Sequence, residues 1–289
     1  MLKQLLKYEF KATSRVYGGL YLALALLSVV LGLSVRGQTV LPSNSKVWQF
    51  VVILSIVYAA VVAAIAVLCL VTTIQRFTQN LLGREGYLMH TLPVTETQLI
   101  LSKLLTSMVW VIGSIALGVL CITVMVGIGA FEPQTFGITD WNSWMMQLKD
   151  ACSRLSAGLG ANFGTILFWT VCINLARLAS VILCIYTACM IAHQFKNHTL
   201  AAGILGFIGL NFVENQIDQL LGIDSVNMFV DVSYQVVGIH VDRGWSIAQR
   251  LVAFGPNVYY LSCFVFTAAI AAAYFFLTRW LMKNKLNLE

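Results

Sequence analysis

Long apolar blocks separated by short polar segments dominate this chain. Each block is long enough to cross a bilayer as a helix, which takes roughly 20 residues. None alternates apolar and polar positions as a barrel strand does, and only helices and closed barrels satisfy the backbone inside a membrane. We therefore predict an all-α polytopic membrane protein, a single transmembrane domain over residues 1–289. Its six transmembrane helices are expected at Tyr17–Val35, Val47–Thr73, Leu99–Ala130, Gly164–Ala192, Leu200–Leu221 and Pro256–Leu281.

Composition supports the membrane assignment. The chain is 59% apolar and only 10% charged, whereas soluble domains are about 45–50% apolar and about 25% charged. Its net charge of +6 is explained by the excess of Lys and Arg that cytoplasmic loops of membrane proteins carry. The charge therefore gives no reason to expect a nucleic-acid partner.

The distribution of basic residues predicts the orientation. With the N-terminus inside, the cytoplasmic side carries eleven basic residues, namely Lys3, Lys7, Lys11, Arg15, Arg76, Arg84, Lys103, Lys196, Arg279, Lys283 and Lys285. The outer side carries six, spread over longer loops, namely Arg36, Lys46, Lys149, Arg154, Arg243 and Arg250. Both termini are thus predicted to be cytoplasmic, which requires an even number of spans.

Two polar segments lie on the predicted cytoplasmic side. The first, Leu2–Thr13, has Leu and Phe on one helical stripe and Lys on another, which predicts an interfacial helix lying on the inner leaflet. It serves either as a topology anchor or as an elbow helix that contacts a partner. The second is the connector 76–103, where Pro93 and a capping box from Thr95 to Gln98 predict a short helix, a turn and then the third span.

The connector carries a family resemblance. The residues Gly83-Arg84-Glu85-Gly86-Tyr87-Leu88, Thr91-Leu92-Pro93 and Ser102-Lys103, with the opening Leu5-Leu6-Lys7-Tyr8-Glu9-Phe10-Lys11, resemble ABC-2-type transporter permeases of Gram-positive bacteria. The resemblance implies a six-span, type V exporter-like fold in the bacterial plasma membrane. It also implies a second permease subunit and a pair of separate ATPase subunits that bind ATP-Mg. The expected ATPase-coupling residues are Arg84, Glu85, Gly86, Tyr87, Leu88 and Pro93.

Polar residues inside spans four and five form a second candidate site. Arg177 lies mid-span, and a stripe at i, i+3, i+4 and i+7 comprises Asn211, Glu214, Asn215 and Asp218. Counted from the turn between the spans, Arg177 and Glu214 both lie roughly 24 Å along their helices. We expect them to pair, helped by Asn174 and Asn215. The cluster is either a structural link between two helices or part of a substrate path.

Small residues and external segments complete the picture. Ala59, Ala60, Ala63 and Ala64 in span two, alanines in span six and glycines in span five favour close helix packing. Outside the membrane, Asp140–Leu155 has the pattern of an amphipathic helix, within an external segment 131–163. The other external segment, 222–255, has no assigned structure.

The sequence lacks the motifs of several common enzyme and cofactor sites. The chain contains no G-x-x-x-x-G-K-[ST] for ATP, no H-E-x-x-H for zinc and no G-x-S-x-G nucleophile elbow. We therefore expect no cofactor in this chain and no enzyme activity of its own. The resemblance implies a permease subunit that exports a peptide, antibiotic or lipid-like molecule. The alternative is a membrane sensor, immunity or scaffold protein that transports nothing.

Overall fold

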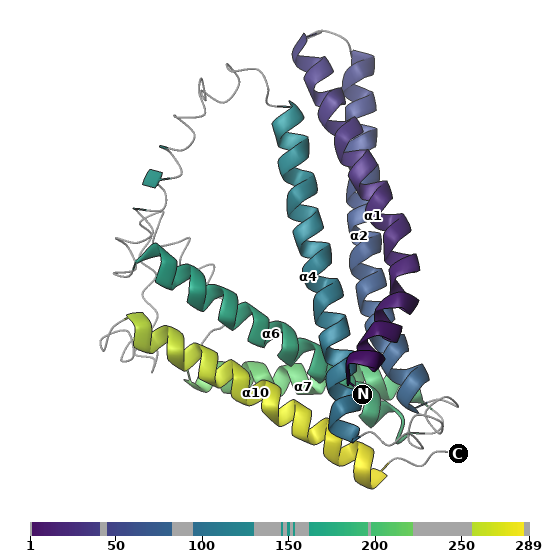
Figure 1. Cartoon of the computed structure of the whole chain (residues 1–289), viewed down its shortest axis with the longest axis vertical. Helices are drawn as coiled ribbons and strands as arrows, with labels where there is room; N and C mark the ends of the chain where they lie inside the picture. Colours follow the sequence, from purple (N-terminus) through teal and green to yellow (C-terminus); the bar gives the residue numbers. More distant parts are fainter. Residues whose placement is uncertain are drawn as a thin grey trace. The chain divides into compact units, whose positions relative to one another are not determined.

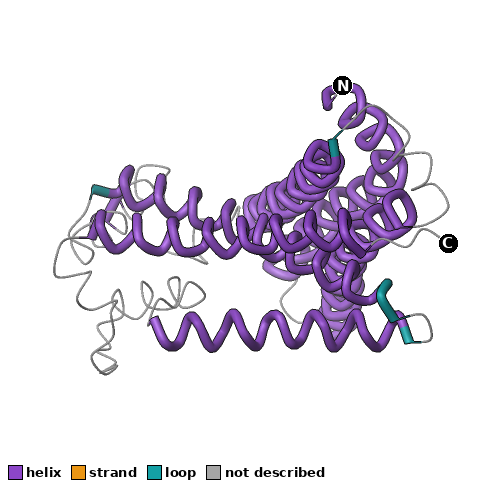
Figure 2. Tube along the Cα trace, turned by 90° about the horizontal axis from the view of Figure 1, so that it is seen from below, coloured by secondary structure: helices purple, strands orange, loops and turns teal. Residues whose placement is uncertain are grey.

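The structure, a computed structural model, is made of helices (Figure 1). It describes residues 2–40, 45–82, 95–129, 146, 149–150, 153, 162–195, 198–221 and 256–285. Within these ranges the regular elements are all helical and no strand occurs (Figure 2). They are α1 (Leu2–Val40), α2 (Ser45–Phe77), the π-helix η1 (Thr78–Leu82), α4 (Glu96–Gly129), α6 (Phe163–Ala192), α7 (Thr199–Leu221) and α10 (Pro256–Lys285).

Six of these helices are long and apolar enough to cross a membrane, which confirms the predicted spans. The qualifying segments are Tyr17–Val35, Trp48–Phe77, Glu96–Met125, Gly164–Ala192, Thr199–Asp218 and Asn257–Asn284. Large apolar side chains also lie on their outsides, with Leu22, Ile53 and Phe212 each more than 60% exposed. Such surfaces suit a helix whose solvent is lipid.

The chain divides into two compact units, Met1–Ser143 and Trp144–Glu289. In the first unit α1, α2 and α4 contact one another. Tyr17 of α1 meets Thr72 of α2, and Tyr21 meets Ser114 of α4. Further along α1, Gly32 lies beside Ile128 of α4. Residues later in α1 contact residues later in α4, so these two helices run parallel. Residues later in α1 contact residues earlier in α2, because Glu9 meets Arg76 and Tyr17 meets Thr72, so α2 runs antiparallel to α1.

A heptad stripe on α1 forms the core of the first unit. Tyr17, Leu24 and Leu31 are spaced by seven residues and are at most 5% exposed. A seven-residue spacing returns to the same face of a helix, so these side chains all point at the neighbouring helices. Tyr17 and Leu24 cluster with Ile65 and Cys69 of α2.

The beginning of α1 differs from the sequence prediction. We predicted a separate interfacial helix over Leu2–Thr13, whereas helix α1 runs without a break from Leu2 to Val40. Glu9 and Thr13 are buried, at 8% and 4% exposed, so this segment packs against the other helices of its unit. Glu9 and Thr13 lie on the same face as Leu2, Leu6 and Phe10, so the apolar stripe of this segment faces the protein and carries two polar side chains with it.

The second unit repeats this arrangement with α6, α7 and α10. Helices α6 and α10 pack side by side, from Ile173 with Tyr260 and Cys263 to a hydrogen bond of 2.9 Å between Thr187 and Thr278. They are therefore parallel. Helix α7 runs antiparallel to α6 and contacts it closely, because a Cβ on Gly203 would lie 3.2 Å from the Cβ of Ala192.

Some of the small residues expected to favour close helix packing lie at helix contacts, and others do not. Gly203 and Gly206 of α7 do lie against α6. Ala59, Ala60, Ala63 and Ala64 of α2, in contrast, are all exposed in the structure, so they do not mediate the predicted close packing within their unit.

The external segments 131–163 and 222–255 lie almost wholly outside the described residues. Of the predicted helix Asp140–Leu155, the structure describes residues 146, 149–150 and 153, and these are helical.

Gly32 of α1 lies tightly against α4 and provides a test of the first unit. A Cβ at this position would lie 3.0 Å from the Cβ of Ile128 and 3.1 Å from the carbonyl oxygen of Met125. We expect Gly32→Leu to destabilise the protein by about 1–3 kcal/mol through overpacking, measured as a lower thermal midpoint in detergent. Gly19→Leu on the same helix is the control, because nothing lies within 4 Å of its Cβ position. Equal midpoints for the two variants would contradict the packing.

Candidate functional site

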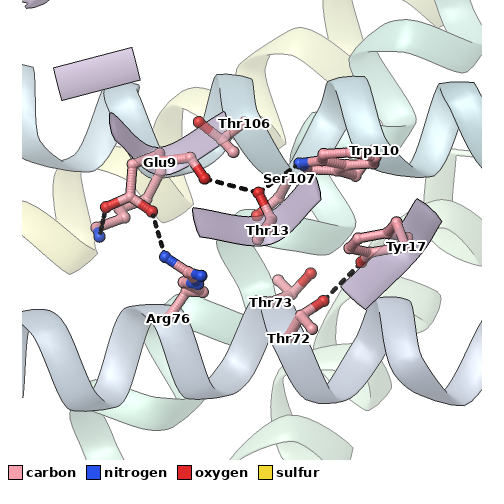
Figure 3. A pocket seen from close by; sticks show the side chains of 10 residues that line it. Glu9, Thr13, Tyr17, Thr72, Thr73, Arg76, Thr106, Ser107 and Trp110 are labelled. Carbon is pink, nitrogen blue, oxygen red and sulfur yellow. Dashed lines mark hydrogen bonds and ion pairs between the residues drawn. The ribbon is translucent and has the colours of Figure 1, made fainter. Parts of the chain in front are cut away.

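Three helices of the first unit meet around the carboxylate of Glu9 on α1 (Figure 3). Its Oε2 lies 3.2 Å from Nη1 of Arg76, in the last turn of α2. Its Oε1 accepts a hydrogen bond from Nζ of Lys103, near the start of α4. One carboxylate therefore bridges two cations from two other helices, a group that we call the Glu9 triad.

The Glu9 triad is buried to different depths. Glu9 is 8% and Lys103 4% exposed, whereas the side chain of Arg76 is 28% exposed. An ionised group removed from water needs a paired and hydrogen-bonded partner. Lys103 has the Glu9 carboxylate as its paired anion, and Glu9 has both Lys103 and Arg76 as its paired cations. Each member thus stabilises a charge that would otherwise be costly to bury.

Next to the triad, hydroxyl and aromatic side chains connect the same three helices. The indole Nε1 of Trp110 donates to Thr13 Oγ1 at 2.8 Å, and that hydroxyl donates to the carbonyl oxygen of Glu9 at 2.7 Å. The Tyr17 ring stacks on Trp110 with centroids 4.3 Å apart. Its hydroxyl lies 2.6 Å from Thr72 Oγ1 on α2. This polar column fixes the depth of α1 against both neighbours.

Local sequence explains how these side chains converge. Glu9, Thr13 and Tyr17 are spaced by four residues, which places them one above the other on a single helix face. Lys103 and Trp110 are spaced by seven on α4 and likewise share a face. Arg76 lies at the carboxyl end of α2, where the helix dipole favours a positive charge.

The converging residues line a pocket between the three helices. Its lining comprises Glu9, Thr13, Tyr17, Thr72, Thr73, Arg76, Lys103, Thr106, Ser107 and Trp110. The space enclosed between them is only about 20 Å³, which is room for about one water molecule. This pocket is therefore too small for a transported molecule.

The Glu9 triad stands at the two ends of the predicted connector. Arg76 and Lys103 were the limits assigned to it from sequence, and both bind the same carboxylate. The predicted coupling residues between them, Arg84, Glu85, Gly86, Tyr87, Leu88 and Pro93, lie outside the described residues. Thr95 does precede the first residue of α4, as predicted for the N-cap, and its hydroxyl lies 2.9 Å from that of Thr97.

In the second unit, polar contacts surround Glu214 and Asn211 of α7. The Tyr274 hydroxyl of α10 donates to Glu214 Oε2 at 3.0 Å. Asn211 donates to the carbonyl of Phe207 at 2.8 Å, and its Nδ2 lies 3.7 Å from Cys184 Sγ on α6. This part of the predicted polar stripe thus faces the other helices of its unit.

The other predicted members of this stripe have different surroundings. Asp218 is buried, at 3% exposed, and Asn215 is exposed. Asn174 of α6 is exposed and donates to the carbonyl of its own Thr170.

The pairing of Arg177 with Glu214 stays a prediction. Cys184 lies opposite Asn211. Arg177 precedes Cys184 by seven residues and Asp218 follows Asn211 by seven, so in these antiparallel helices Arg177 is level with Asp218. Glu214 is one turn closer to the helix connection.

Sequence reasoning missed two residues that carry these contacts, Glu9 and Tyr274. From the sequence, Glu9 appeared only as part of the opening string Leu5–Lys11 that resembles the permease family. Its spacing of four and eight residues from Thr13 and Tyr17, in register with the apolar stripe of α1, was the available signal. Tyr274 had no signal of its own, since a tyrosine within an apolar span is typical of any helical membrane protein.

Comparisons with protein-family models, curated proteins and solved structures gave no match. The geometry therefore supports a polytopic helical membrane protein with a charged junction between three helix ends. Any more specific function has to be argued from the residues themselves.

Removal of the Glu9 carboxylate should strongly destabilise the first unit. We expect Glu9→Ala to lower stability by about 3–5 kcal/mol, because breaking a buried ion pair leaves an uncompensated cation, here Lys103. The double variant Glu9→Ala/Lys103→Met should recover part of this loss. Thermal midpoints in detergent provide the measurement, with Lys11→Gln as an exposed control on the same helix. A double variant less stable than Glu9→Ala alone would show that the pair does not hold the helices.

The contact between Tyr274 and Glu214 can be tested by a double-mutant cycle. We expect Tyr274→Phe and Glu214→Gln to be non-additive by about 1–2 kcal/mol, because a hydrogen bond to a charged group contributes about 1.5–3 kcal/mol. A parallel cycle with Arg177→Ala measures whether Glu214 also interacts with Arg177. Additivity of Tyr274→Phe and Glu214→Gln within about 0.5 kcal/mol would argue against the contact.

Proposed function

We propose that this chain is the membrane-spanning permease subunit of an ABC transporter of the ABC-2 type. The observation that carries the proposal is the Glu9 triad, which joins the beginning of α1 to both ends of the connector. A segment that transmits force into a membrane domain needs ends that are fixed to the spans. Six helices of membrane-spanning length and the resemblance of the connector to that family support the same proposal.

In this proposal the connector contacts a separate ATPase subunit on the cytoplasmic side. Closure of the ATPase pair on ATP-Mg displaces the connector. Because Arg76 and Lys103 share the Glu9 carboxylate, α2 and α4 then move together with α1 rather than separately. Movement of the three spans as one body changes the side from which the substrate path is open.

Specific connector residues have distinct proposed roles. Arg84 and Glu85 offer charge-assisted contacts to the ATPase, while Tyr87 and Leu88 offer an apolar anchor for a groove. Gly86 and Pro93 belong to the turns that present them. A second permease subunit completes the transporter, which we place in the bacterial plasma membrane with both termini cytoplasmic.

The substrate is proposed to be a peptide, an antibiotic or a lipid-like molecule that leaves the cell. The pocket at the Glu9 triad does not suit this role, since it has room for about one water molecule. The better candidate for part of the path is the polar stripe of α7, where Asn211, Glu214, Asn215 and Asp218 lie within a candidate span. Polar residues inside a membrane are typical of substrate pathways.

The alternative function is a membrane sensor, immunity or scaffold protein that transports nothing. A triad that fixes three helix ends is equally useful in a protein whose spans do not move. The two functions differ in their partners, because only the permease needs an ATPase subunit.

Co-purification tests the proposed function directly. Tagged wild-type chain, expressed in a Gram-positive bacterial host, should retain an ATPase subunit through detergent purification, identified by mass spectrometry. The double variant Glu85→Arg/Tyr87→Ala should lose most of it, because it reverses one charge and removes the proposed anchor. Lys11→Gln, an exposed change on α1, should retain the ATPase as wild type does. Folded protein without an ATPase in all three preparations would contradict the permease function and favour the alternative.

A further inference from the structure

One face of α10, in the second unit, carries a continuous exposed stripe. Its members recur at spacings of three and four residues, which keeps them on one side of the helix. They are Ala269, Ala272, Phe276, Arg279, Trp280 and Lys283, and all are exposed. The residues of α10 that pack against α6, among them Cys263 and Thr278, lie on the opposite side. The stripe is therefore on the outer side of its own unit.

The stripe changes from apolar to basic toward the end of α10. Phe276 is 64% and Trp280 is 53% exposed, and the exposed cations Arg279 and Lys283 follow them. These two cations are four residues apart, a spacing at which like charges on a helix repel each other. Helix α10 itself contains no Asp or Glu that would offset them. An anion bound between the two side chains would relieve the repulsion.

The basic end of the stripe has hydrogen-bond donors to offer to that anion. Among the described residues, no side chain or backbone group bonds the ammonium of Lys283 or the indole N–H of Trp280. An ammonium carries three donors and an indole one, and the Arg279 guanidinium adds a planar group with five. Arginine and lysine are the usual protein partners of phosphate oxygens. The end of the stripe therefore suits a phosphate group.

The depth of the stripe points to a lipid as the source of the phosphate. Arg279 and Lys283 lie in the last two turns of the candidate span Asn257–Asn284, where the hydrocarbon region gives way to headgroups, and Trp is typical of that depth. One leaflet contributes about 15 Å of hydrocarbon, or about ten helical residues. A lipid whose phosphate lay at Arg279 would therefore place an acyl chain along Phe276 and Ala272, on the same face. A free phosphate ion would gain nothing from these apolar residues.

We propose that the exposed stripe of α10 binds one anionic phospholipid. Arg279 and Lys283 hold its phosphate, Trp280 lies beside the headgroup, and Phe276 contacts an acyl chain. The bound lipid neutralises the two cations and fixes the depth of α10 in the leaflet that its basic end faces. This site does not rest on the permease function, since it needs only the helix face, its charge and its depth.

Native mass spectrometry of the full chain, purified in detergent, tests the proposal. The chain is offered phosphatidylglycerol or phosphatidylcholine with the same acyl chains, because the choline group of the second lipid brings a positive charge toward the two cations. We expect wild type to retain one phosphatidylglycerol about tenfold more strongly than phosphatidylcholine. In Arg279→Gln/Lys283→Gln this preference should fall to about twofold or less, because both charges that attract the anionic lipid are removed.

Two further variants separate the charge of the site from its apolar part. Lys7→Gln/Lys11→Gln is the matched control, since it also removes two exposed cations four residues apart. Toward the span, that face of α1 continues with Ser14 and Gly18, which offer an acyl chain no apolar side chain. Its lipid preference should stay within about twofold of wild type. Phe276→Ala should lower the retention of both lipids by about threefold and leave their ratio unchanged, because only apolar contact is lost.

Four results would overturn the lipid site. Equal retention of both lipids by wild type would do so without any variant having to fold. An equal loss of preference in the α1 control would indicate general attraction to basic surfaces. Full displacement of the lipid by millimolar inorganic phosphate would indicate a site for the free ion. A wild-type dimer that becomes a monomer in Arg279→Gln/Lys283→Gln would indicate that a second copy of the chain covers this face.

Discussion

The arrangement of the first unit depends on one constraint, that an ionised carboxylate buried among helices must be paired. Glu9 meets it with Arg76 from α2 and Lys103 from α4, residues distant in sequence that are brought to one point. The same requirement explains why α1 runs straight from Leu2 into its span. If its first turns lay flat on the membrane, the two cations would lose their common anion. Trp110, Thr13 and Tyr17 then extend the junction toward the apolar core.

The Glu9 triad links the two ends of the connector, a relation that the sequence alone does not show. Both ends of the connector are fixed to the same side chain. In the proposed permease, a displacement of the connector by an ATPase subunit would therefore be shared among three spans. In the second unit, Thr187 contacts Thr278 and the Tyr274 hydroxyl donates to Glu214. The two units thus share a helix arrangement built on different side chains.

The spans were predictable from sequence because a bilayer leaves little choice. Every apolar block of sufficient length had to be a helix, and Tyr17–Val35 and Gly164–Ala192 were predicted to the residue. Contacts between spans were less predictable. The partners of Glu9 lie 67 and 94 residues away, and an amphipathic stripe at a chain's beginning looks the same whether it faces lipid or protein. Alanine pairs in α2 suggested packing but are exposed, while the tight contact at Gly32 had no motif. The expected coupling residues, such as Glu85, lie outside the described part of the chain.

Hydrogen exchange at the beginning of α1 tests the central claim most directly. The claim is that the Glu9 triad fixes this segment to α2 and α4. In wild type, amides between Lys7 and Thr13 should then exchange slowly, although they lie outside the candidate span Tyr17–Val35. In Glu9→Gln they should exchange at least about tenfold faster, while peptides from α6 stay unchanged. Equally fast exchange of this segment in both proteins would contradict the claim, because it is the behaviour of a helix lying independently on the membrane surface.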